Sequence, residues 1–140
     1  MKLSTTTISV HTNGPGLIDI TPEVVRWLDR ERVGDGQLTL FIRHTSASLV
    51  IQENADPDVP KDLEDFMHRL APWTALLYRH RTEGPDDMPA HIRSALTNVS
   101  LTIPVLGGRL VLGTWQAVYL WEHRSAAQNR EVVAQLLTNP

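Results

Sequence analysis

The stretch that decides the fold is GRLVLGTWQAVYLWEHR, residues 108–124. In an extended chain, its aromatic residues at positions 115, 119 and 121 point to one side, and the aliphatic residues at 118 and 120 point to the other. Large apolar side chains on both sides are typical of a strand that is buried on both faces. We therefore predict a strand from Thr114 to Glu122, and in so small a chain we expect another subunit to cover part of one face.

Further strand patterns flank this segment on both sides. Gly107-Gly108 is a two-residue hairpin signal, and Gly113 suggests a bulge at the start of the long strand. Alternating or β-branched residues predict the other strands. These strands cover residues 3–10, 38–43, 47–51, 73–80, 101–105, 109–112 and 130–137.

Three helices are predicted between the strands. The first begins at Thr21-Pro22 with the threonine as its cap, and the second begins at Asp56-Pro57 and ends at Pro72. The third follows Asp87. Apolar side chains at helical spacing are expected to face the core. They are Val59, Leu63, Phe66, Met67 and Leu70 in the second helix, and Ile92, Ala95 and Leu96 in the third.

Length and composition limit the class of protein. With 140 residues and no regular alternation of strands and helices, residues 1–140 predict one α+β domain with a largely antiparallel, sandwich-like core. The absence of cysteine excludes disulfides and thiolate chemistry. A net charge of −3 argues against nucleic-acid binding, and no apolar run is long enough to cross a membrane. We expect a cytoplasmic protein.

Two polar clusters fall in the first two-thirds of the chain. The first joins His44 to the acid-rich stretch that contains Asn54 and Asp58, where the carboxylates are either helix caps or part of a site. The second spans residues 78–91 and contains Glu83, Asp87 and two histidines. His44, His80 and His91 predict a centre for a divalent ion such as zinc, although each histidine could instead pair with an acid.

A third cluster lies at the end of the long strand. Gln116, Glu122 and Arg124 share one side of it, and Arg130 follows shortly after. An arginine beside a carboxylate is either a structural ion pair or a guanidinium fork that binds a phosphate or carboxylate ligand. No phosphate-binding loop or serine-hydrolase elbow occurs in the sequence.

Three runs of the sequence together resemble the YjbQ-like family, whose members are often labelled secondary thiamine-phosphate synthases. The runs are HTSASLVIQENADPDVPKD (44–62), EGPDDMPAHI (83–92) and GRLVLGTWQAVYLWEHR (108–124). The resemblance implies a compact α+β fold assembled as a homotrimer. It also implies that His44, His80 and His91 gather at a subunit-boundary cleft that can bind a metal or an anion. Residues that fall within or beside the shared motifs are carried over as pocket residues: Asp58, Glu83, Asp87, Gln116, Glu122 and Arg130.

The function implied by the resemblance is the joining of an aminopyrimidine methyl diphosphate to a thiazole phosphate with release of pyrophosphate. In this hypothesis His44, Asp58, Glu83 and Glu122 are catalytic, and His44 donates a proton. Substrate is bound by Asn54, Asp87, Gln116, Arg124 and Arg130. His44, His80 and His91 hold zinc or magnesium, and no organic cofactor is expected. Two alternatives remain open: a metal-dependent hydrolase of a small phosphorylated metabolite, or a non-catalytic trimer that binds a metal or ligand.

Overall fold

The strand predicted from Thr114 to Glu122 corresponds to β7 (Gln116–Glu122). It is the middle strand of a three-stranded antiparallel sheet, between β2 (Gly16–Asp19) and β4 (Ala47–Glu53). All residues of β7 after the first are buried, which confirms the prediction of burial on both faces for residues 117–122. Trp115, which the prediction had included, lies before the strand and is 61% exposed. The computed structural model describes residues 1–139.

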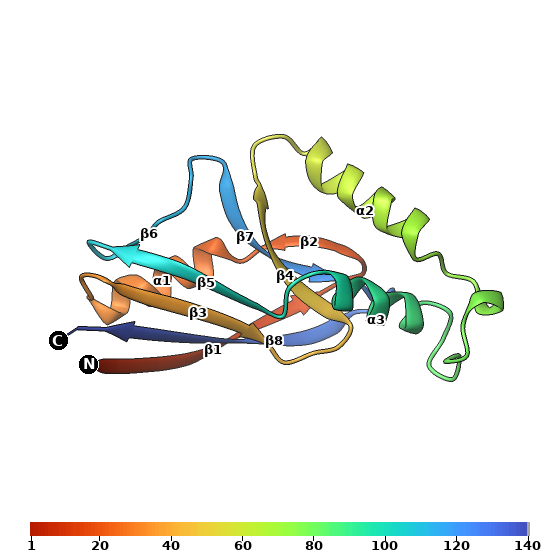
Figure 1. The fold of residues 1–140 in the computed structure, drawn as a ribbon, viewed down its shortest axis with the longest axis horizontal. Coiled ribbons are helices and arrows are strands. Elements are labelled where there is room, and N and C mark those ends of the chain that lie inside the picture. Colours follow the sequence, from red (N-terminus) through yellow and green to blue (C-terminus); the bar gives the residue numbers. More distant parts are fainter. Residues whose placement is uncertain (140) are drawn as a thin grey trace.

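A second antiparallel sheet of five strands packs against the first (Figure 1). Its order is β1 (Lys2–Thr12), β8 (Gln128–Thr138), β3 (Gly36–Ile42), β5 (Ser100–Leu106) and β6 (Arg109–Leu110). The register sets Leu38 opposite both Leu136 and Ile103. These residues share one core with Leu49 and Leu120 of the smaller sheet. The α+β, sandwich-like fold is therefore confirmed.

Three α-helices and a short 3-10 helix complete the part of the chain that is described. Helix α1 (Thr21–Glu31) buries Val24, Trp27 and Leu28 in the core. Helix α3 (Asp87–Leu96) lies beside β4, and the 3-10 helix η1 (Ala75–Leu77) lies in the loop before α3. Figure 1 shows this loop at the opposite end of the molecule from the two termini. The loop and α3 together carry the second polar cluster.

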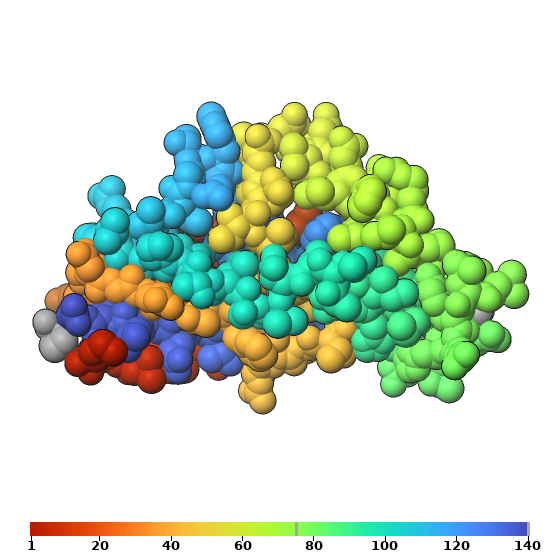
Figure 2. Space-filling view, viewed as in Figure 1, coloured from red at the N-terminus to blue at the C-terminus, as the bar shows by residue number. Residues whose placement is uncertain are grey.

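Helix α2 (Asp58–Leu70) departs from its predicted packing. It is amphipathic, but Met67 is its only residue classed as buried. Phe66 and Leu70 are 52% and 51% exposed, and Figure 2 shows α2 along the upper margin of the molecule with a hollow beneath it. The predicted apolar face exists, but the described chain covers little of it.

Helix α3 also turns an unexpected face inward. Leu96 and Ala95 are exposed, whereas Asp87, Ala90 and Arg93 are buried. The prediction that Ile92, Ala95 and Leu96 point inward was therefore wrong for the last two. Polar groups from the loop and from neighbouring elements satisfy the buried Asp87, so this helix buries a polar side rather than its apolar one.

Several predicted element boundaries differ from the structure. Residues 73–80 form η1 and loop instead of a strand, and β2 was not predicted at all. The long strand begins at Gln116 rather than Thr114, because the Gln116 side chain accepts the backbone N–H of Gly113 and closes a turn there. Thr21 is the first residue of α1 rather than its cap. Asp19 accepts the Thr21 N–H, and the Thr21 hydroxyl accepts the Val118 N–H.

None of the described helices is both long and apolar enough to cross a bilayer. The cytoplasmic location stays a prediction.

Candidate metal centre

Two imidazoles and one carboxylate meet at the start of α3. The Nε2 atoms of His80 and His91 lie 2.7 and 3.1 Å from the same Asp87 oxygen, Oδ2. One ligand atom from each of the three residues lies within 4.8 Å of the others. The Asp87 side chain is 2% exposed, while those of His80 and His91 are 38% and 32% exposed. A buried carboxylate therefore lies beneath two solvent-accessible imidazoles, and this donor set suits a zinc-like divalent ion.

The backbone fixes which nitrogen of His91 carries its hydrogen. His91 Nδ1 lies 2.9 Å from the carbonyl oxygen of Thr45, which can only accept a hydrogen bond. Nδ1 is therefore the protonated nitrogen, and in the neutral ring Nε2 presents a lone pair towards Asp87 Oδ2. A lone pair and a carboxylate oxygen at this distance require a positive charge between them, either a proton on Nε2 or a metal ion. A carbonyl on the far nitrogen is also the usual support of a metal-binding histidine.

Arg124 holds the acidic loop in place from the other side. Its Nη1 lies 2.7 Å from Asp87 Oδ1, its Nε donates to Asp86 Oδ2 at 2.9 Å, and its Nη2 donates to the Glu83 carbonyl. Gly84 permits this tight loop because its φ of +100° is unfavourable for other residues. Arg124 thus occupies the second oxygen of Asp87 and leaves Oδ2 for the histidines.

The pKa values of the two aspartates follow from these contacts. Burial alone raises the pKa of Asp87, but the hydrogen bond from His80 and the charge of Arg124 outweigh it and lower the pKa. Burial also raises the pKa of Asp86, and hydrogen bonds from Ser125 and Arg124 bring it below its usual range. Both groups are therefore carboxylates at neutral pH, as metal binding requires.

A second polar centre joins the two sheets. Glu122 is fully buried and accepts hydrogen bonds from Arg130 Nε and Thr12 Oγ1, both at 2.7 Å, and from the backbone N–H of Arg124. Burial raises the pKa of Glu122, and the hydrogen bonds from Arg130 and Thr12 reverse this and lower it. Since both oxygens of Glu122 are occupied inside the chain, the structure favours the ion-pair interpretation for this glutamate.

His44 lies next to this centre and outside the cluster of His80, Asp87 and His91. Its Nδ1 is 3.4 Å from Arg130 Nη1, and its Nε2 accepts the Glu131 backbone N–H at 2.8 Å. His44 and His91 nevertheless line one hollow of about 310 Å³, together with Thr45. The predicted ligands were His44, His80 and His91. In the described chain, the third residue that lies with His80 and His91 is Asp87 and not His44.

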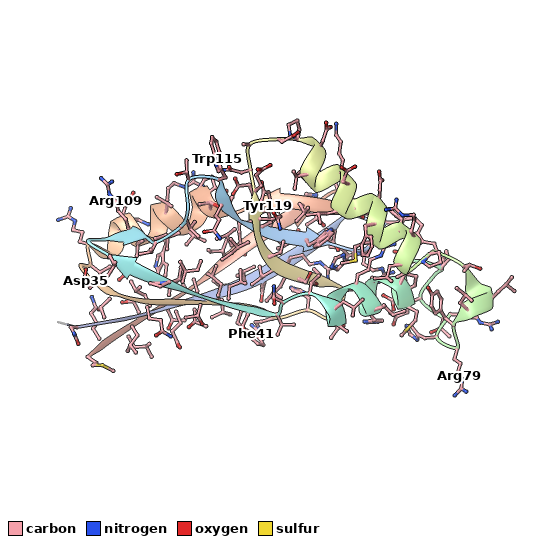
Figure 3. The ribbon with its side chains drawn as sticks, turned by 45° about the horizontal axis from the view of Figure 1, so that its top comes forward. Asp35, Phe41, Arg79, Arg109, Trp115 and Tyr119 are labelled. Carbon is pink, nitrogen blue, oxygen red and sulfur yellow. The ribbon has the colours of Figure 1, made fainter. Side chains whose placement is uncertain are left out.

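Of the remaining predicted site residues, one lies beside the histidine cluster and three lie in other parts of the chain. Glu83 is exposed, lies in the loop beside Asp87 and affects its pKa. Asn54 and Asp58 are also exposed, at the end of β4 and the start of α2, and the Asp58 N–H is accepted by Asp56, which supports the capping interpretation there. Figure 3 shows Trp115, the neighbour of Gln116, far from Arg79, the neighbour of His80. The structure therefore does not bring Gln116 to the histidine cluster.

Sequence reasoning gave no role to three residues of these centres: Thr45, Ser46 and His123. The carbonyl of Thr45 fixes His91, and Ser46 accepts from Arg130 Nη2 through its carbonyl and hydroxyl oxygens. His123 is fully buried. Backbone carbonyls carry no sequence signal. In contrast, the i, i+4 spacing of Asp87 and His91 on one helix face was a readable signal for their pairing.

Known proteins resemble this chain in sequence over most of its length. The family model described as "UPF0047 protein YjbQ-like" matches residues 6–139. The UPF0047 protein sll1880 of Synechocystis is 52% identical, over 91% of this chain and 86% of its own length. The UPF0047 protein YjbQ of Escherichia coli O157:H7 is 44% identical, over 93% of this chain and 94% of its own.

Solved structures show the same fold. An uncharacterized conserved protein of the yjbq/upf0047 family from Clostridium acetobutylicum superposes with a TM-score of 0.86 at 34% identity, covering 94% of this chain and 99% of its own. A conserved hypothetical protein from Thermus thermophilus gives 0.85 at 38% identity, with the same coverage.

Proposed function

We propose that this chain, which belongs to the UPF0047 YjbQ-like family, is a metal-dependent enzyme acting on a small phosphorylated substrate at the His80–Asp87–His91 cluster. The convergence of these two imidazoles on one buried carboxylate oxygen carries the proposal. Two nitrogens and one oxygen suit zinc or a similar ion better than magnesium, which prefers oxygen ligands. When bound, such an ion supplies positive charge to phosphate oxygens and lowers the pKa of a bound water.

The chain's own residues prepare the site for this role. Arg124 fixes Asp87 through Oδ1, and the Thr45 carbonyl fixes His91 through Nδ1, so that two of the three ligand atoms are oriented before anything binds. The exposed faces of His80 and His91 leave access for substrate. Preorganised charge at the reacting phosphate is the main requirement of phosphate chemistry.

The first candidate reaction is the one that the family resemblance implies, a thiamine-phosphate synthase-type transfer. The bond between the methylene carbon and the diphosphate oxygen breaks, and its electron pair leaves with pyrophosphate. The thiazole nitrogen then uses its lone pair to form the new carbon–nitrogen bond. Catalysis of this reaction consists mainly of stabilising the charge on the departing diphosphate.

The second candidate is hydrolysis of a phosphate ester, and one observation favours it. The two arginines expected to receive a diphosphate are largely engaged within the chain: Arg124 pairs with Asp86 and Asp87, and Arg130 pairs with Glu122 through Nε and Nη2. Among the described residues, Nη1 of Arg130 has no carboxylate partner. A single phosphate group at a metal ion needs fewer free cations than a departing diphosphate does.

We also propose that the chain assembles with itself, as a homotrimer. The exposed apolar residues of α2 and η1 support this proposal, since Leu76 and Leu77 are exposed together with Phe66 and Leu70. Several large apolar side chains exposed close together in the sequence are typical of a surface that another subunit covers. Light scattering should give the mass of three chains.

Metal content and activity test the proposal together. Purified protein should contain about one divalent ion per chain by elemental analysis, and His80→Ala should lose at least tenfold in metal affinity. The matched control is His11→Ala, since His11 is exposed on β1 and, within the described part of the chain, its side chain contacts Asn129 as its one hydrogen-bond partner. A metal content equal in both variants would contradict the site.

Activity is then measured with metal-loaded wild type and both variants. One assay supplies the pyrimidine diphosphate with the thiazole phosphate and measures thiamine phosphate, and the other supplies a panel of phosphate esters and measures released phosphate. Turnover that depends on His80 in one assay identifies the reaction. If the protein binds metal but shows no turnover in either assay, the enzyme proposal is wrong and the chain is a metal-binding protein.

A further inference from the structure

The hydrogen-bond partners of His44 determine where its proton lies. The backbone N–H of Glu131 points at His44 Nε2 over 2.8 Å. A backbone N–H can only donate, so Nε2 must be the acceptor and the ring hydrogen must be on Nδ1. Burial and the charge of Arg130 lower the pKa of His44, which keeps the ring neutral and preserves this tautomer. His44 therefore presents a donor, Nδ1–H, on its other side.

Arg130 presents a second donor at the same point. Its Nη1 lies 3.4 Å from His44 Nδ1, so two N–H groups face each other without an acceptor between them. The other nitrogens of this guanidinium are in use, since Nε and Nη2 donate to Glu122 and Nη2 also donates to Ser46. Among the described residues, His44 is the only recorded polar contact of Nη1. Arg130 is 5% exposed, and a buried donor without an acceptor is costly.

Both donors line a hollow that is suited to an anion. It measures about 530 Å³ and is lined by Phe41, Ile42, Arg43, His44, Thr45, Ser46, Val99 and Arg130. Two arginines and no acidic residue are among these eight, and Arg43 pairs with the neighbouring Glu131 at 3.3 Å, so Arg130 is the cation that remains for a ligand. Phe41 is 47% exposed and labelled in Figure 3, and with Val99 it offers an apolar wall. Apolar walls with a few convergent donors are typical of small-molecule sites.

This hollow adjoins the candidate metal centre. It shares His44, Thr45 and Val99 with the hollow that His91 lines, and the carbonyl of Thr45 holds His91. A molecule with an anionic group between His44 and Arg130 could thus extend towards His91.

We propose that His44 Nδ1–H and Arg130 Nη1–H together bind a phosphate group of the substrate, through one oxygen that accepts from both. The identification of this anion as part of the substrate rests on the proposed function; its binding does not require the metal. A phosphate oxygen carries enough lone pairs and charge to accept from a guanidinium and an imidazole at once. The substrate then has a second group that reaches the metal centre, which favours a metabolite with two separated polar ends.

The test uses inorganic phosphate and chelator-treated full-length protein at constant ionic strength. Calorimetric titration should give saturable binding to the wild type, with weaker binding of acetate. His44→Ala should weaken phosphate binding about tenfold or more, because a hydrogen bond to a charged group is lost. His11→Ala should leave it unchanged. His80→Ala should lose metal affinity and keep phosphate affinity, while His44→Ala should show the reverse.

Nitrogen NMR of the histidine rings tests the same proposal without any substitution. His44 should be protonated at Nδ1 in the free protein, and this signal should shift as phosphate is added. Three results would overturn the proposal: His44 protonated at Nε2, equal phosphate affinity in wild type and His44→Ala, or acetate binding as tight as phosphate. If His80→Ala loses metal but the wild type shows no saturable phosphate binding, the phosphate proposal is overturned and the proposed metal-dependent function stands.

Discussion

Acidification from pH 7 to pH 5 should destabilise the folded chain by about 2 kcal/mol through His123 alone. This side chain follows the end of β7 and is fully buried, with Nε2 2.9 Å from the Ser48 hydroxyl; among residues 1–139, Nδ1 has no hydrogen-bond partner. Burial, followed by the charge of Arg93, lowers the pKa of His123 to about 3. The folded state therefore keeps the ring neutral throughout this pH range.

The magnitude follows from proton linkage. The unfolded chain binds a proton at His123 below a pKa of about 6.5, whereas the folded chain does not bind it until about 3. A lowered pKa contributes stability that is present above 6.5 and is lost as the pH falls. The slope is about 1.4 kcal/mol per pH unit, so that about 2 kcal/mol is lost at pH 5. The lowered pKa values of Glu122, Asp86 and Asp87 start from 4.5 or below and act at more acidic pH. The lowered pKa of His44 acts in the same direction as that of His123, so the difference between wild type and a His123 variant isolates the contribution of His123.

Urea unfolding followed by tryptophan fluorescence measures this effect at pH 7, 6 and 5. A chelator and a fixed protein concentration keep metal binding and assembly constant. His123→Gln should be less stable at pH 7 but should lose about 2 kcal/mol less than the wild type between pH 7 and pH 5. His11→Gln, which changes an exposed histidine, should follow the wild type. Equal pH slopes for wild type and His123→Gln would refute the reasoning and show that water reaches the His123 ring.

Two further substitutions test the packing. Gly36→Ala should destabilise the fold by about 1–3 kcal/mol, because the new carbon would lie 2.5 Å from the Leu137 carbonyl oxygen. Gly34→Ala, whose new carbon has no atom within 4 Å apart from its chain neighbours, should change stability by less than about 0.5 kcal/mol. Thermal unfolding measures both glycine variants. Arg130→Met should cost about 3–5 kcal/mol in urea unfolding, since it leaves the fully buried Glu122 without its cation. A cost below about 1 kcal/mol would mean that water replaces the guanidinium.

Part of the candidate site was readable from the sequence. The acidic loop and its histidines stood out by composition, and Asp87 and His91 are one helical turn apart. The choice between Asp87 and His44 as the partner of His80 and His91 was not readable. It depends on ring direction, and the carbonyl of Thr45 and the N–H of Glu131 set that direction from segments far away in the chain. Backbone groups are the same at every residue, so no sequence pattern marks them.

By itself the sequence determined most of the local elements of this protein, although it did not indicate β2 and wrongly predicted a strand over residues 73–80. Alternation at 38–42 and 101–105 specified strands, and the apolar residues on both sides of 116–122 specified a strand buried on both faces, because side-chain direction follows directly from the period of two. Only the tertiary structure decided which polar groups are buried together. Glu122 and Arg130 belong to strands of different sheets, and His80 reaches Asp87 across a loop. Such contacts depend on how the layers pack, and the energy of a buried charge depends on partners that no local pattern contains.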